Sequence, residues 1–113
     1  YFAMMELDAH SLYLIRRHKF LPEIYGEAPV AVASAAEYCL KQINAVAPAI
    51  GDIEDLIFGA TISAADILLA STLDFAERYE VTLPASCRAY RDRAYARPAF
   101  LAAKRRNEDL DAH

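Results

Sequence analysis

Apolar residues recur at helical spacing along most of the chain. Five segments separated by Pro or Gly show this pattern, and it predicts helices over about residues 1–20, 29–47, 63–79, 85–96 and 99–106. Alanine makes up about a fifth of the residues and β-branched residues are sparse, which favours helix over strand. The sequence therefore predicts an all-α helical bundle with no sheet.

The third expected helix has the most strongly specified start. Ser63 stands at the N-cap and Asp66 follows three residues later, so each side chain can accept a hydrogen bond from the other's backbone N–H. This is a capping box with Asp in place of the usual Glu, and Ile62 and Ile67 flank it as a hydrophobic staple. The next turns are apolar or small on every side, so we expect protein all round them. The prediction is a bundle built around this buried, N-capped central helix.

The first expected helix is apolar on two sides and needs two partners. Asp8 falls within the broad apolar arc, where a carboxylate is either hydrogen-bonded in a buried site or directed into a cleft. Glu6 lies on a narrow polar strip, where it either pairs with His10 at i,i+4 on the surface or reaches the same cleft as Asp8. Ser11 is expected on a second polar strip.

The remaining helices have simpler patterns. In the second helix Cys39 is expected to be a buried, inert thiol beside the apolar stripe that packs. The residues of that stripe are Val30, Ala33, Ala36, Leu40, Ile43 and Ala47. In the central helix Asp74 and Arg78 have the i,i+4 spacing of an ion pair. In the fourth helix three residues are expected to point inward (Cys87, Tyr90, Ala94) and three outward (Arg88, Arg91, Asp92). The last segment, 107–113, lacks an apolar period and is expected to fray.

The chemistry that the residue types allow is limited. The three histidines, His10, His18 and His113, have no metal-ligand spacing with Cys or with one another, so no metal site is expected. There is no Gly-rich phosphate loop and no Ser or Cys nucleophile motif. We therefore expect no catalytic residue in this chain, and a domain that binds or packs.

Charge and composition exclude several classes of protein. The net charge of −4 argues against a nucleic-acid surface, which needs clustered positive charge. No apolar run approaches the roughly 20 residues that span a bilayer, and the start shows no signal-peptide pattern. Two cysteines without a disulfide framework favour a reducing compartment and predict a cytoplasmic protein. Because the chain opens on Tyr1 already in a helical pattern, we expect it to be a fragment of a longer protein.

Two stretches resemble the glutathione transferase family. Residues 56–67 read Leu-Ile-Phe-Gly-Ala-Thr-Ile-Ser-Ala-Ala-Asp-Ile, similar to the Gly turn and Ser-x-Ala-Asp-Ile that open a buried helix in that family. Residues 90–100 read Tyr-Arg-Asp-Arg-Ala-Tyr-Ala-Arg-Pro-Ala-Phe, similar to an ending common in its bacterial members. With helix order and lengths, the resemblance covers residues 1–106 and implies the all-helical C-terminal domain.

The resemblance implies a function for the intact parent protein. It implies an upstream thioredoxin-like domain, absent from this chain, that binds the co-substrate glutathione and activates its thiol. The helical domain would supply a wall for an electrophilic substrate, and its first helix would join a homodimer interface. The implied activity is conjugation of glutathione to that electrophile, as in detoxification, by the parent and not by this chain alone. The alternative is a non-catalytic module in a translation complex or a stress regulator.

The same resemblance implies which residues contact ligand. In the bacterial beta class the first helix carries Glu-Leu-His with its acidic residue and His near glutathione. Glu6 and Leu7 match, but Asp8 stands in place of the His. A carboxylate beside a thiol would raise its pKa, so Asp8 cannot take over the role of the His. We expect Met5, Glu6 and Asp8 to contact glutathione or substrate.

Overall fold

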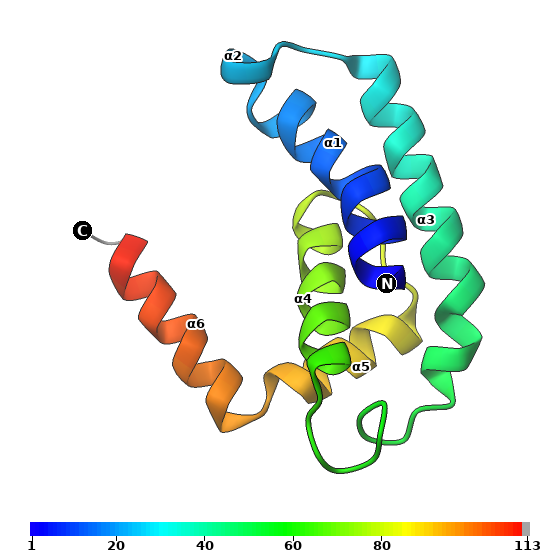
Figure 1. Ribbon diagram of the computed structural model, residues 1–113, viewed down its shortest axis with the longest axis vertical. Helices are drawn as coiled ribbons and strands as arrows, with labels where there is room; N and C mark the ends of the chain where they lie inside the picture. Colours follow the sequence, from blue (N-terminus) through cyan, green and yellow to red (C-terminus); the bar gives the residue numbers. More distant parts are fainter. Residues whose placement is uncertain (112–113) are drawn as a thin grey trace.

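The computed structural model describes residues 1–111, and these form an all-α helical bundle with no strand (Figure 1). The elements in chain order are the π-helix η1 (Phe2–Leu12), α1 (Tyr13–Ile15), the π-helix η2 (Arg16–Phe20), α2 (Pro22–Tyr25), α3 (Pro29–Gly51), α4 (Ala64–Arg78), α5 (Ala85–Tyr95) and α6 (Pro98–Asp111). The predicted fold class is confirmed.

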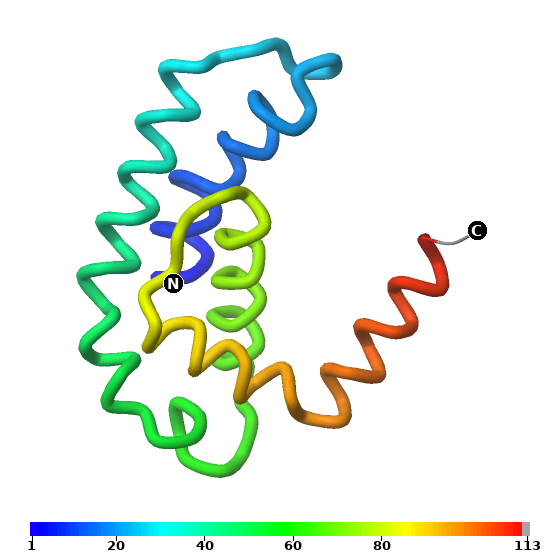
Figure 2. Tube along the Cα trace, turned by 180° about the vertical axis from the view of Figure 1, so that it is seen from behind, coloured from blue at the N-terminus to red at the C-terminus, as the bar shows by residue number. Residues whose placement is uncertain are grey.

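The first three elements form one continuous helix, which packs against both α3 and α4 (Figure 1). The helix α5 crosses near one end of α4 and contacts α3 as well, which closes the bundle. The helix α6 then leaves this body and extends away from it, as both views show (Figure 2). The core therefore lies between the first helix, α3, α4 and α5.

The first helix is wound more widely than an α-helix, and this corrects the predicted faces. The N–H of Tyr13 bonds to the carbonyl of Asp8, and the N–H of Leu21 bonds to that of Arg16 at 3.0 Å, both across five residues. Because a wider turn shifts every side chain around the axis, the 3.6-residue periodicity misplaces polar groups. Ser11 is fully buried, with its hydroxyl on the carbonyl of Leu7, whereas Asp8 is exposed.

The helix α3 runs through Pro48 to Gly51, beyond its predicted end at 47. Proline is disfavoured inside a helix, but Ile50 in the next turn is buried in the core, which favours continuation. The predicted stripe is only partly packed, because Val30 is 85% exposed whereas Ile43 is fully buried. The buried residues of α3 are Ala35, Cys39, Ile43 and Ile50.

The start of α4 is as predicted, but its surroundings are not. Ser63 is the N-cap, its side chain accepts from the N–H of Asp66, and the capping box is complete. Ile67, Leu68 and Phe75, however, are each at least 40% exposed on one open face. The expectation of protein on every side of this helix is therefore wrong for the described chain.

The last helix is longer than predicted. The helix α6 continues to Asp111, so residues 107–111 are helical where a frayed tail was expected, and residues 112–113 of that tail lie outside the described part. All residues from 101 to 111 are exposed, so this length is not set by burial. Lys104 and Glu108, 3.9 Å apart, form an i,i+4 pair that supports the helix locally.

Candidate functional site

The three expected ligand-contact residues lie on η1 with different exposure. Met5 is 46% exposed, Asp8 is exposed and Glu6 is half-buried. The alternative of a buried hydrogen bond for Asp8 is therefore wrong, because its carboxylate faces solvent. Asp8 remains open to a ligand or a partner.

Glu6 is engaged with α3 rather than with His10. The hydroxyl of Tyr38 donates to the Glu6 carboxylate, and this hydrogen bond is the main cause that raises the pKa of Tyr38. The ring of His10 stacks on that of Tyr38 with centroids 6.2 Å apart. Glu6, His10 and Tyr38 thus form a polar cluster that joins the first helix to α3.

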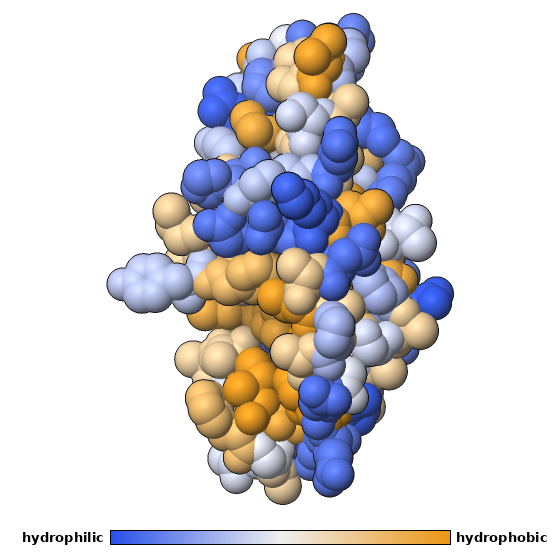
Figure 3. All heavy atoms as spheres, turned by 90° about the vertical axis from the view of Figure 1, so that its right-hand side faces the viewer, coloured by the Kyte–Doolittle hydropathy of each residue, from blue (hydrophilic) through white to orange (hydrophobic). Residues whose placement is uncertain are grey.

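A shallow hollow of about 290 Å³ adjoins this cluster between the first helix and α3. His10, Ser34 and Tyr38 supply its polar groups, and Leu14 and Ala35 its apolar surface. Seen from the side of α3, apolar side chains gather over the middle and lower part of the molecule (Figure 3). Sequence reasoning missed Tyr38, because a single Tyr on a packing helix carries no signal of its partner.

Asp66 is the centre of a buried hydrogen-bond network. Its carboxylate, which is fully buried, accepts from the Ile57 N–H at 2.9 Å, the Ser63 N–H at 3.0 Å, the Ser63 hydroxyl at 2.8 Å and the Tyr90 hydroxyl at 2.8 Å. Burial alone would raise the pKa of Asp66, but these four donors outweigh it and the pKa is lowered. Burial, followed by the bond to Asp66, raises the pKa of Tyr90.

A tight turn places one of these donors. Leu56 and Gly59 exchange two backbone hydrogen bonds, at 3.0 and 3.1 Å, and so enclose Ile57. Gly59 has φ of 99°, a conformation that side chains disfavour, so glycine suits this position. The turn, the capping box and α5 therefore meet at one carboxylate.

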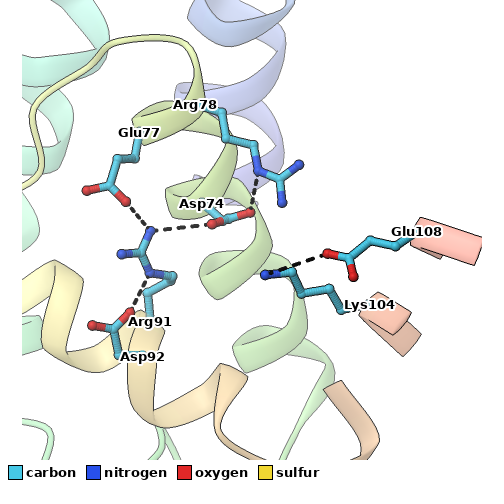
Figure 4. Close-up of polar contacts among 7 residues, drawn as sticks. All are labelled: Asp74, Glu77, Arg78, Arg91, Asp92, Lys104 and Glu108. Atoms are coloured by element: carbon cyan, nitrogen blue, oxygen red, sulfur yellow. Dashed lines mark hydrogen bonds and ion pairs between the residues drawn. The ribbon is translucent and has the colours of Figure 1, made fainter. Parts of the chain in front are cut away.

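Arg91 joins α4 to α5 through a network of ion pairs (Figure 4). It was predicted to point outward, but the residue is only 9% exposed. Its guanidinium lies 2.5 Å from Glu77, 2.9 Å from Asp92 and 3.4 Å from Asp74. The predicted pair of Asp74 with Arg78 is confirmed at 2.9 Å. These charges draw Arg91 inward, which apolar periodicity cannot reveal.

The thiols are placed as predicted, inside the bundle. Cys39 and Cys87 are both free and fully buried. Burial raises the pKa of each thiol, partly offset by hydrogen bonds with Ser11 and Ser86 respectively. A buried thiol with a raised pKa carries little thiolate, so neither cysteine is placed to act as a nucleophile.

Within residues 1–111, no three His, Cys, Asp or Glu side chains gather in a way that could hold a metal ion; His113 lies outside this part. Among these residues, too, no helix is long and apolar enough to cross a membrane.

We compared the chain with known protein families, curated proteins and solved structures. No family model, curated protein or solved structure matches the chain. The resemblance to glutathione transferases therefore rests on the two sequence stretches alone.

Proposed function

We propose that this chain is the helical second domain of a bacterial-type glutathione transferase. In the parent protein it would form one wall of the electrophile site, beside glutathione held by an upstream thioredoxin-like domain. The parent would be a cytoplasmic homodimer that conjugates glutathione to an electrophile.

One observation supports this proposal most strongly. The two stretches that carry the resemblance, 56–67 and 90–100, are far apart in sequence, yet Tyr90 from the second donates to Asp66 of the first at 2.8 Å. Both stretches therefore contribute to the same buried hydrogen-bond network around Asp66. The contact ties them into one structural unit, as parts of a single domain pattern would be.

The exposure of the first helix also suits a missing neighbour. Met4 and Met5 are 55% and 46% exposed at its start, close in sequence to the carboxylates of Glu6 and Asp8. Apolar surface beside ionised acceptors can pack on a protein domain and accept hydrogen bonds from a polar ligand. Since Glu6 already accepts from Tyr38, Asp8 is the freer acceptor for the ammonium group or a polar edge of glutathione.

The proposal is tested on the chain expressed with the segment encoded upstream of it. We expect that segment to contain a thioredoxin-like sequence with a Ser, Tyr or Cys near its start. The joined protein should bind glutathione by calorimetric titration and conjugate it to a general aromatic electrophile. Absence of the upstream sequence, or absence of glutathione binding by the joined protein, would overturn the proposal.

The same experiment separates the enzyme from a non-catalytic interaction module. The buried thiols, with their raised pKa values, favour the module for this chain taken alone. If the joined protein binds glutathione but does not turn over any electrophile, the parent is better described as a non-catalytic interaction module.

A further inference from the structure

The helix α6 has little packing beyond its first turn. Phe100 stacks against Tyr95 of α5, with ring centroids 5.0 Å apart, but residues 101–111 are all exposed. Leu110, near the end of the helix, is 69% exposed. A helix of only 14 residues is marginally stable in water without tertiary contacts. A partner that covers α6 would therefore stabilise it.

A groove of about 420 Å³ lies between α4 and α6. Phe75 of α4 and Phe100 and Leu101 of α6 give it apolar surface. Lys104 and Glu108 also line it and project from α6 toward α4 (Figure 4). The groove thus combines apolar surface with charges of both signs.

The charges of α6 are divided along its length. Three cations come first and three carboxylates follow: Lys104, Arg105 and Arg106, then Glu108, Asp109 and Asp111. This order does not favour an isolated helix. Carboxylates in the last turn interact unfavourably with the helix dipole. An i,i+4 ion pair is also weaker when the Lys precedes the Glu than when the Glu precedes the Lys. When two such helices lie antiparallel, the basic part of each faces the acidic part of the other. The pattern is complementary to a second copy of itself.

We propose that α6 and the groove beside α4 form an interface between two copies of this chain, with their α6 helices antiparallel about a two-fold axis. Such an interface is closed, because each copy offers the same surface to the other. The charges set the antiparallel orientation, and the apolar residues of the groove supply the buried surface. This interface uses other elements than the first-helix interface implied by the family resemblance, so it stands or falls separately from the proposed function.

Two charge-reversal variants of the chain test the proposal by sedimentation equilibrium. One is Lys104→Glu/Arg105→Glu/Arg106→Glu, and the other is Glu108→Lys/Asp109→Lys/Asp111→Lys. We expect the unmodified chain to dimerise and each variant alone to have a dissociation constant raised about tenfold or more, since like charges then face each other. An equimolar mixture of the two variants should form a heterodimer.

The matched control is Glu37→Lys/Lys41→Glu, which reverses two exposed charges on α3, on the side of the molecule away from α6 (Figure 1). It should dimerise like the unmodified chain. Because mixing restores complementarity, the heterodimer also shows that the single variants failed through repulsion and not through a melted helix.

Each other outcome overturns the proposal. An unmodified chain that is monomeric at roughly 100 µM lacks any such interface. If neither charge-reversal variant changes dimerisation, the dimer contact does not involve α6 and lies elsewhere, for example on the first helix. The same conclusion follows if the α3 control no longer dimerises. Variants that stay monomeric after mixing show that the charges of α6 do not pair between copies.

Discussion

Asp66 is the side chain on which most of the local structure depends. Changing Asp66 to Ala removes the acceptor of four donors, three of them from the turn and the helix start and one from α5. We expect a loss of roughly 2–4 kcal/mol in the free energy of unfolding, because a cap is lost and buried donors are left unpaired. Urea unfolding measures it.

Two variants define this first prediction. Tyr90→Phe removes one donor only and should cost about 1 kcal/mol. Ser63→Ala acts on the same turn as Asp66→Ala, so the double variant should lose less than the sum of the two. A urea midpoint unchanged in Asp66→Ala would mean that the start of α4 is held by other contacts.

The stability that Asp66 provides should depend on pH. Its folded pKa is below the ordinary value of 3.8, so the contribution is complete above the unfolded pKa and is lost as pH falls through the folded pKa. Wild type and Asp66→Asn should therefore differ most near neutral pH and converge in acid. Urea midpoints over a pH series check the sign, and a difference that widens in acid would contradict it.

Asp8 gives the second prediction, which depends on the proposed function. The side chain is exposed, so Asp8→Asn should leave the urea midpoint unchanged. In the protein joined to its upstream domain it should weaken glutathione binding about tenfold or more, because a charge-assisted hydrogen bond is lost. Calorimetric titration measures the affinity. Asp52→Asn, also exposed but at the C-terminal end of α3, is the matched control, and equal affinity in both variants would remove Asp8 from the site.

Between elements, the contact of α4 with α5 depends on Arg91. In Arg91→Met the aliphatic stem is kept but Asp74, Glu77 and Asp92 lose a shared cation. These carboxylates are partly exposed, so water screens them and we expect a loss of about 1–3 kcal/mol rather than the larger cost of a fully buried pair.

Arg88 provides the comparison for this third prediction, because it lies on the same helix but is exposed. Arg88→Met should change stability by less than about 0.5 kcal/mol. Urea unfolding of both variants measures the difference. If Arg91→Met is as mild as Arg88→Met, the ion pairs at this junction add nothing to stability.

Structural features that are determined by residues close together in the sequence could be predicted. The capping box of α4 lies within four residues, and the inward face of α5 follows from the spacing of Cys87, Tyr90 and Ala94. Features decided by distant residues could not be predicted in this way. Arg91 is drawn inward by carboxylates of α4, and Pro48 is kept helical by the burial of Ile50.

The candidate site shows the same division. Met5, Glu6 and Asp8 could be proposed from their place in the sequence, but their environments depend on the winding of the first helix and on Tyr38 from α3. This segment has wider turns than the periodicity of an α-helix assumes. Because of the wider turns, Ser11 lies in the core and Asp8 lies at the surface.

At the scale of the whole molecule, the bundle has a closed core and an open side. Tyr90 and Leu73 are fully buried, whereas Ile67, Leu68 and Phe75 form an exposed face on α4. Apolar surface of this kind marks a place where other protein packs. We therefore expect the chain to fold alone but to act only as part of a larger assembly.

The last prediction concerns the chemistry of the folded chain by itself. Its two thiols are fully buried and their pKa values are raised, so a maleimide should modify them slowly in the folded state and rapidly in urea. For the same reason the pure chain should not conjugate glutathione to an aromatic electrophile above the uncatalysed rate. Mass spectrometry of the modified chain and a spectrophotometric conjugation assay are the measurements. Turnover by the chain alone would show that residues 1–113 contain a catalytic group, and rapid thiol modification without urea would point to the cysteines as that group.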